Sequence, residues 1–202
     1  MTTFAEMQTK VNDLTKRPEL VALTKLAIRM ATVRAHQVDF FSRDQRNILL
    51  TYTPYNSGEI YTDITTIYST LPLMRTPDFI QILDATSGLP LEILEYVVDY
   101  KNFWDNEGCL KGSVFTLLGA TLRFRSLSNT GKAQFYVYQN PSVDDVGYGS
   151  WIADMYPDEV AAWAAAIVWM RSGYQEIAKQ MNSDIIEPFK SMLVESHLTS
   201  KV

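Results

Sequence analysis

The stretch that decides the fold is PELVALTKLAIRMATVRAHQVDFF, residues 18–41. Placed at about 100° per residue, its apolar side chains cover well over half of the helix circumference. Only a narrow stripe is polar: Lys25, Arg29, Thr32 and His36. A helix that packs on a core from one side needs an apolar stripe only about 100° wide. We therefore expect a helix over residues 18–41, with Pro18 at its first position, covered on two sides by its own fold or by a neighbouring subunit.

Arg34 falls inside the apolar zone of this predicted helix. In one interpretation its stem packs on apolar neighbours while the guanidinium reaches water. In the other, the guanidinium pairs with a carboxylate across an interface, a role for which arginine is favoured. We favour the first interpretation and keep the second open.

Length and composition set the broad class. The chain has 202 residues, of which 47% are apolar, which fits one domain with a real core. The net charge is -5, so no general basic field favours nucleic-acid binding. With the single cysteine, Cys109, no intrachain disulfide is expected, which favours a reducing compartment. The sequence shows neither a membrane-spanning apolar run nor the pattern of a signal peptide at its start.

Further helices are predicted before and after this central helix in the sequence. Thr3 and Glu6 have the spacing of a capping box, which predicts a helix over residues 4–14. Near the other end, Pro157 begins a helix to about residue 172 that is apolar on every face and should be buried all round. A last helix begins near residue 174, and Pro188 should kink or break it near Ile185. The tail from His197 should be frayed. The predicted buried face of the first helix consists of Phe4, Met7, Val11 and Leu14.

The middle of the chain is rich in β-branched and aromatic residues separated by turn signals. The pattern predicts antiparallel strands with short connections and one helical turn at 100–104. The predicted strands cover residues 48–53, 59–69, 79–83, 91–98, 113–118, 121–125 and 134–138. Residues 91–98 fit a strand or a helix almost equally well, and we favour a strand. The predicted fold class is α+β: a helical bundle of the N-terminal helices plus a C-terminal helix pair, with an inserted antiparallel β-rich middle region. We interpret residues 1–202 as a single domain, helical over 1–46 and 147–195, with the β-rich insertion at 47–140.

The sequence shows no reactive constellation. His36 and His197 do not accompany a nucleophile in any recognised motif, and one cysteine with two scattered histidines does not suggest a zinc site. We interpret His36 as a surface or interface histidine. Asp144 and Asp145 are interpreted as solvated loop acids, with a carbohydrate-active enzyme kept as an alternative. We therefore expect no catalytic residues, no metal and no cofactor.

The tyrosines of the β-rich region allow a further alternative, a stacking platform for single-stranded nucleic acid. Such a platform also needs a basic groove. Arg123, Arg125 and Lys132 are the only local basic cluster, and nearby acids dilute it. A strand-rich region is naturally rich in tyrosine, which is the interpretation we favour.

The order of these segments resembles a known family. A short helix leads into TKRPELVALTKLAIRMATVRAHQVDFFSRD, residues 15–44, and the β-rich middle is followed by GSWIADMYPDEV, residues 149–160, and two closing helices. This arrangement resembles the head–tail adaptor (connector) proteins of tailed bacteriophages. The similarity is clearest over residues 3–44 and 147–187.

The resemblance implies a virion structural protein, made in the host cytoplasm and located at the head–tail junction. Such adaptors form rings, commonly of twelve copies, that bind the portal protein and present a platform to tail tube or tail hub proteins. Genomic DNA passes through the ring without sequence-specific binding, and no membrane is involved. A tail-completion or tail-attachment protein of the same virion is the alternative. The resemblance implies subunit contacts along 18–41 and 157–172 and a portal-binding arm at about 185–202, so the candidate interface residues are Arg34, Trp163, Trp169, Phe189, Met192 and Leu193.

Overall fold

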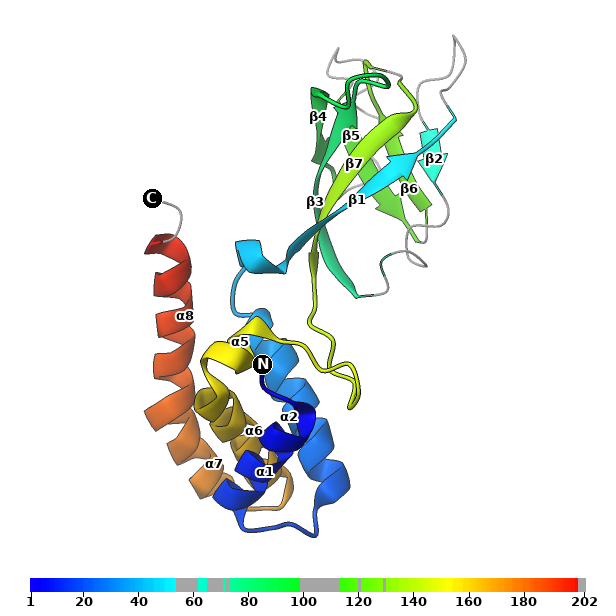
Figure 1. Ribbon diagram of the computed structural model, residues 1–202. Coiled ribbons are helices and arrows are strands. Elements are labelled where there is room, and N and C mark those ends of the chain that lie inside the picture. The colour runs from blue at the N-terminus through cyan, green and yellow to red at the C-terminus, as the bar shows by residue number, and fades with distance from the viewer. Residues whose placement is uncertain are drawn as a thin grey trace. The chain divides into compact units, whose positions relative to one another are not determined.

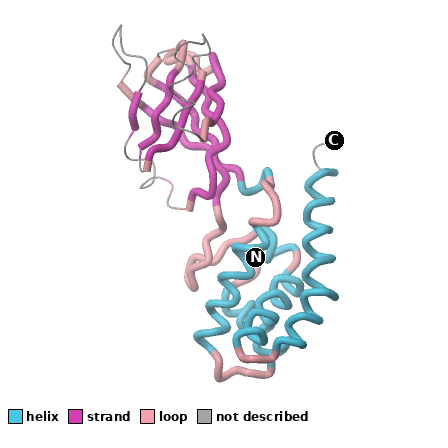
Figure 2. Tube along the Cα trace, turned by 180° about the vertical axis from the view of Figure 1, so that it is seen from behind, coloured by secondary structure: helices cyan, strands magenta, loops and turns pink. Residues whose placement is uncertain are grey.

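The computed structural model describes residues 1–53, 62–64, 71, 73–98, 113–119, 121–128 and 130–199. The structure is α+β, as predicted. The chain divides into two compact units: a helical unit, Met1–Asp44 with Asn140–Val202, and a β unit, Gln45–Gln139. Figures 1 and 2 show helices in the first unit and a sheet in the second. The single-domain interpretation stays a prediction.

Helix α1, Phe4–Thr15, begins at the predicted capping box. The Glu6 N–H donates to Thr3 Oγ1 at 3.2 Å, and the Thr3 N–H donates to Glu6 Oε2 at 2.8 Å. Phe4, Met7 and Val11 are buried as predicted, but Leu14 is 48% exposed and Thr15 takes its place. The buried face runs in steps of three or four residues, and the step of four from Val11 selects Thr15.

Helix α2, Val21–His36, is shorter than the predicted helix at both ends. Pro18 lies in a turn closed by the Leu20 N–H and the Arg17 carbonyl at 3.1 Å, so its predicted place inside the helix is wrong. One face of α2 is buried, at the spacing of a helix that packs from one side. That face consists of Thr24, Ala27, Ile28, Ala31, Thr32, Ala35 and His36.

Helix α6, Pro157–Arg171, lies at the centre of the helical unit (Figure 1). Every residue from Val160 to Val168 is buried, which confirms the prediction of a helix covered on all sides. Its side chains share one apolar cluster with those of α1 and α2. The alanines of α6 let these helices approach closely, because a methyl group adds little width to the helix.

The segment before α6 packs two aromatic side chains. Tyr148 is buried edge-on against Phe4, with ring centroids 5.5 Å apart, and its hydroxyl lies 2.9 Å from Thr32 Oγ1. Trp151 begins the short helix α5, Trp151–Met155, and packs edge-on against Phe41 with centroids 5.3 Å apart. These contacts attach the returning chain to α1 and α2.

The last helix is interrupted where Pro188 predicted a break. Helix α7, Gln175–Met181, continues through a π-helical turn, η2, Asn182–Ile186, into α8, Glu187–Thr199. Proline has no N–H and its ring clashes with the carbonyl four residues earlier, and a wider turn relieves both effects. The predicted fraying from His197 is wrong as far as Thr199, where α8 ends.

The β unit is a seven-stranded sheet in the order β1-β7-β3-β4-β5-β6-β2. Neighbouring strands are antiparallel except β4 and β5, which are parallel, so the prediction of an antiparallel region with short connections is wrong at this pair. A parallel pair needs a long crossover, and here the connection covers residues 97–113. The strands are β1 Gln45–Thr51, β2 Thr62–Ile64, β3 Met74–Leu83, β4 Pro90–Tyr96, β5 Val114–Leu118, β6 Thr121–Arg125 and β7 Lys132–Gln139.

Strand β3 begins at Met74, earlier than predicted, and runs through Pro77. The strand tolerates this proline because β4 pairs with β3 only from Phe79 onward, which leaves one edge of β3 without a sheet partner at Pro77. The predicted helical turn at 100–104 and most of the predicted strand 59–69 lie outside the described residues.

Alternating residues of the strands fill a second apolar core inside the β unit. Phe115, Phe124 and Phe135 are fully buried in it. Glu92 of β4 ties the sheet to two loops: its carboxylate accepts the Ser126 hydroxyl at 2.8 Å and the N–H groups of Leu127 and Ser128 at 3.0 and 2.9 Å. It also accepts a hydrogen bond from the Ser113 hydroxyl.

Candidate interaction surfaces of the helical unit

The six candidate interface residues divide into buried and exposed groups. Trp163, Phe189 and Leu193 are 6%, 3% and 0% exposed and belong to the core of the helical unit. Their side chains pack α8 against α6. These three residues would therefore affect assembly only by holding the two helices in place. Arg34 and Met192 are exposed and Trp169 is half-buried. The assignment of all six to an interface stays a prediction.

Helix α2 carries a second apolar stripe that the described residues cover only in part. Leu26 is 40% exposed, and Met30 and Val33 are half-buried. Their spacing of four and three residues places them on one face. We call Leu26, Met30 and Val33 the α2 stripe. The predicted two-sided cover of this helix is therefore present on one side only within the described part of the chain.

Arg34 lies beside the α2 stripe. Its side chain lines a shallow depression of about 310 Å³ with Arg29, Met30, Val33 and Gln37. Within the described residues, Arg34 forms no ion pair and no side-chain hydrogen bond. Both interpretations of Arg34 therefore stay predictions: a stem that packs while the guanidinium reaches water, and a guanidinium that pairs with a carboxylate of a partner.

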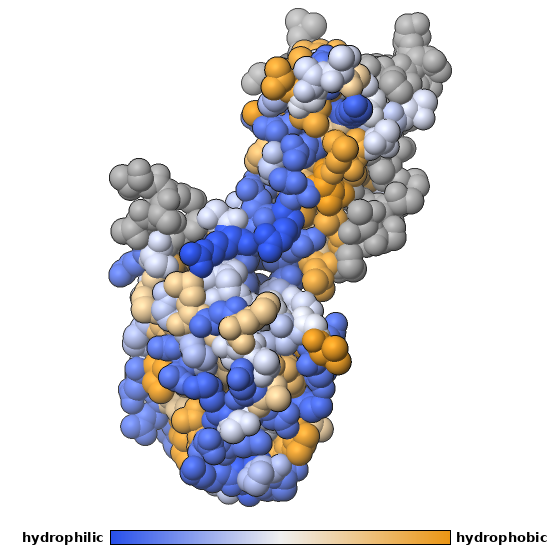
Figure 3. Space-filling model, viewed as in Figure 1, coloured by the Kyte–Doolittle hydropathy of each residue, from blue (hydrophilic) through white to orange (hydrophobic). Residues whose placement is uncertain are grey.

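Figure 3 shows the face of the helical unit seen in Figure 1, which is mainly hydrophilic with separate apolar spots. Exposed apolar side chains are therefore set among charges rather than gathered into one large patch. Such a surface is typical of an interface with small apolar centres and a polar rim. The exposed apolar residues of this unit beyond the α2 stripe include Leu14, Met155, Met170, Tyr174, Ile177, Ile185 and Met192.

Asp145 is tied to α2 rather than free in its loop. It accepts Lys25 Nζ at 2.6 Å and Arg29 Nη2 at 2.8 Å. Hydrogen bonds from Lys25 and then Arg29 lower the pKa of Asp145 below its ordinary value. A lowered pKa is the opposite of what a general acid at a glycosidic bond requires. The pair Asp144 and Asp145 therefore includes one carboxylate with a structural function.

A buried polar cluster that the sequence analysis missed joins three segments of the helical unit. His36 Nδ1 lies 2.8 Å from both carboxylate oxygens of Asp44, and His36 Nε2 lies 2.9 Å from Ser150 Oγ. Trp151 Nε1 donates to Asp44 Oδ1 at 2.7 Å. His36 is 2% exposed, so its interpretation as a surface or interface histidine is wrong. It is buried because Asp44 and Ser150 satisfy both of its ring nitrogens.

Aspartate, histidine and serine are also the side chains of the hydrolase triad. Here Ser150 is 5% exposed, and its hydroxyl oxygen accepts the Ala153 N–H at 3.1 Å as the N-cap of α5. A nucleophilic serine must instead reach a substrate. The cluster therefore fixes the end of α2, the 3-10 turn η1 (Ser42–Asp44) and the start of α5 to one another.

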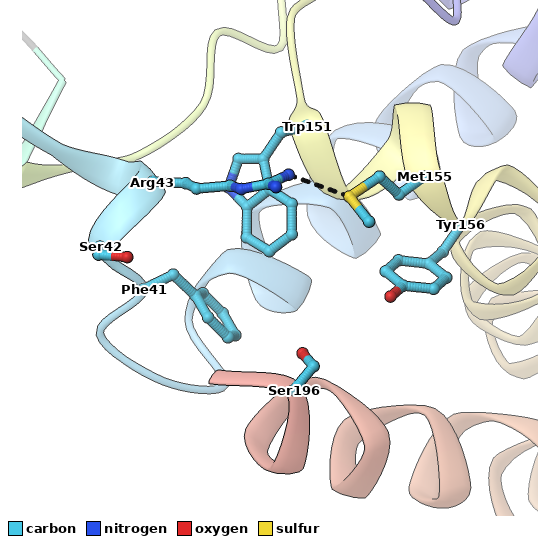
Figure 4. A pocket seen from close by; sticks show the side chains of 7 residues that line it. All are labelled: Phe41, Ser42, Arg43, Trp151, Met155, Tyr156 and Ser196. Atoms are coloured by element: carbon cyan, nitrogen blue, oxygen red, sulfur yellow. Dashed lines mark hydrogen bonds between the residues drawn. The ribbon is translucent and has the colours of Figure 1, made fainter. Parts of the chain in front are cut away.

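An open pocket of about 270 Å³ lies next to this cluster (Figure 4). The rings of Phe41, Trp151 and Tyr156 surround the space, with Ser196 of α8 across from them. The Arg43 guanidinium lies 5.1 Å from the centre of the Trp151 ring, and its Nη1 lies 3.1 Å from Met155 Sδ. Ser150 does not line the pocket. The pocket offers apolar contact, one cation and the side chains of Ser42 and Ser196, and of the buried cluster only the Trp151 side chain lines it.

Two of the tyrosines considered as a stacking platform, Tyr52 and Tyr136, differ in where they pack. Tyr52 is 8% exposed and packs against Phe124 in the core, while Tyr136 stacks on Phe79 outside it, with centroids 4.3 Å apart. Arg125 of the local basic cluster is buried. This division weighs against a continuous platform.

Among the described residues, no group of three or more histidine, cysteine or acidic side chains is arranged to hold a metal ion. In the same residues, no helix is long and apolar enough to cross a membrane. Neither a family model nor a curated protein matches this sequence.

Proposed function

We propose that the protein is a head–tail adaptor (connector) of a tailed bacteriophage. In this proposal it is a virion structural protein whose copies form a ring between the portal of the head and the tail, leaving a channel for DNA. One support is the position of the segments that carry the resemblance. Residues 3–44 and 147–187 belong to one compact unit although the β unit separates them in the sequence.

The observation that carries the proposal is the partly exposed α2 stripe. The helix already buries one face against α6. On its other side Leu26 is 40% exposed, Val33 is half-buried, and Met30 is half-buried with contact to the core of the unit, so the described residues cover this second apolar face only in part. Apolar surface removed from water contributes about 25 cal/mol per Å². A subunit of a ring gains this contribution at each contact with its neighbours.

The same proposal assigns a part of the adaptor to each unit of the structure and to α8. We interpret the helical unit as the adaptor's helical bundle and the β unit as its insertion, and α8 as the candidate portal-binding arm. Phe189 and Leu193 would anchor this arm on α6, while Met192 faces away from the core. The ring would have about twelve copies, as the resemblance implies, and its net negative charge would repel DNA phosphates rather than hold them.

The test is assembly with the portal protein of the same phage. Purified full-length protein, alone and mixed with portal, is examined by multi-angle light scattering and electron microscopy. We expect a ring docked on the portal. A protein that stays monomeric and never joins the portal would refute the adaptor role, while co-purification with tails that lack heads would favour the tail-completion alternative.

The carbohydrate-active alternative receives no support from the site. Asp145 is held by two cations with a lowered pKa. An Asp144→Asn/Asp145→Asn variant that loses a measured glycosidase activity of the wild-type protein would revive this alternative.

A further inference from the structure

The helical unit has a groove on a different side from the α2 stripe. It lies between α1, the first turns of α6 and the π-helical turn η2, and has a volume of about 390 Å³. Its apolar lining includes Leu14 and Ile185, which are 48% and 37% exposed, and the small side chains of Ala161 and Ala162. In Figures 1 and 2, α2 lies at one flank of the unit and the α7–α8 segment at the other.

The rim of this groove is acidic. Asp13 of α1 and Glu159 of α6 line it, and neither forms an ion pair within the described residues. Asp158 also lines it but is paired with Lys10 at 2.5 Å. The groove therefore carries two negative charges that the chain does not balance locally.

The side of the unit around the α2 stripe is basic. Arg34 forms no ion pair with the residues that the structure describes, and Arg171 lies close to the stripe, with its Nη2 3.7 Å from Met30 Sδ. Lys25 and Arg29 add two cations against the single carboxylate of Asp145. An apolar ridge with a basic rim thus lies on one side of the unit, and an apolar groove with an acidic rim lies elsewhere on it.

We infer that the α2 stripe of one copy packs into the α1–α6–η2 groove of the next copy, with Arg34 facing Asp13 and Glu159. This inference rests on the proposed ring and names its two contact surfaces. Two different, complementary patches give a heterologous contact, which is the kind that closes into a ring, whereas a twofold dimer uses the same patch twice.

The shapes of the two surfaces suit this contact. Leu26, Met30 and Val33 form a ridge along one helix face, which is how an amphipathic helix enters an apolar groove. Ala161 and Ala162 leave room for such a ridge to come close to α6. Opposite charges at the rim set the orientation and suppress other pairings.

The experiment measures self-association of the full-length protein by sedimentation velocity over a range of concentrations, with and without portal. Arg34→Glu places like charges against the acidic rim, and we expect self-association at least about tenfold weaker at low salt. Asp13→Lys/Glu159→Lys should weaken it similarly. The triple variant combining these changes restores opposite charges and should return to within about threefold of the wild type.

Two controls make the test specific. Lys179→Glu on exposed α7 reverses a charge away from both surfaces and should associate as the wild type does. Circular dichroism shows whether each variant is folded. Leu26→Ser gives a second test that involves no charge, and it should also weaken association.

Every result decides the inference. Weakening by each reversal with recovery in the triple variant supports it. If the wild type forms portal-docked rings but the reversals leave association unchanged, or the triple variant stays weak, the inference is overturned and the adaptor role stands. If the wild type never associates with itself or with portal, both are overturned.

Discussion

Replacing Asp44 by alanine tests the buried cluster most directly. The Asp44 side chain is 5% exposed and is the acceptor for His36 Nδ1 at 2.8 Å and for Trp151 Nε1 at 2.7 Å. The substitution leaves two donors without an acceptor, and each buried unsatisfied donor costs about 1–3 kcal/mol. His36 is fully enclosed, whereas Trp151 is half-buried and contributes toward the lower value. We expect a loss of about 3 kcal/mol in the free energy of unfolding of the helical unit.

Asp44→Asn is the matched control for this substitution. It keeps the volume and one carbonyl acceptor but loses the second oxygen and the charge, so we expect about half of the loss. Urea unfolding, followed by circular dichroism at the helical band and separately by tryptophan fluorescence, gives the loss in free energy of unfolding for each of the two variants. A loss below about 1 kcal/mol for Asp44→Ala, or equal losses for the two variants, would show that the two hydrogen bonds do not determine this stability.

Three further predictions concern the β unit, α8 and α6. Burial raises the pKa of Glu92, but hydrogen bonds from Ser113, Leu127, Ser126 and Ser128 outweigh it and lower the pKa below 4.5. Because the folded-state pKa of Glu92 is lowered, its stabilisation of the fold is present above pH 4.5 and is lost as the pH falls through the folded value. In urea unfolding of the β unit, the free energy of unfolding of Glu92→Gln should therefore fall less steeply with decreasing pH than that of the wild type. An equally steep fall would contradict this role of Glu92. On α8, Leu193→Ala should cost about 2–5 kcal/mol, whereas Met192→Ala should change thermal or urea stability by less than about 0.5 kcal/mol; similar costs would contradict the burial difference. In α6, Ala165→Leu adds volume to a fully buried site and should cost about 1–3 kcal/mol by urea unfolding, and a neutral result would mean that the contact with α1 and α2 is loose.

Local chemistry was enough to predict the elements whose signals are contained in a few neighbouring residues. The capping box of Thr3 and Glu6 located the start of α1, and Pro157 with its following acids located the start of α6. Pro188 marked the interruption of the last helix, because its effect on the backbone acts within one turn. These features need no knowledge of distant contacts.

The candidate site was less predictable, because its residues meet only in three dimensions. His36 lies on a polar stripe by helical spacing, and nothing near it in sequence indicates that Ser150 would enclose it. Trp163 and Leu193 were interface candidates because the resemblance implies contacts along their segments, and neither that resemblance nor their apolar character distinguishes a core position from a surface contact. The acidic groove depends on α1, α6 and η2 lying side by side and has no sequence motif.

What the sequence by itself determined was the α+β class, the positions of most helices and strands, and the excess of apolar surface on residues 18–41. Periodicity and capping establish these because they depend on residues within a few positions of one another. The tertiary structure alone decided which face of α2 is covered, that β4 pairs parallel with β5, and that His36 is buried with Asp44 and Ser150. Each of these depends on which distant segment lies opposite. The α2 stripe was already apolar in the sequence, but only the packing of α2 on α6 decides that Leu26 stays exposed while Met30 contacts the core.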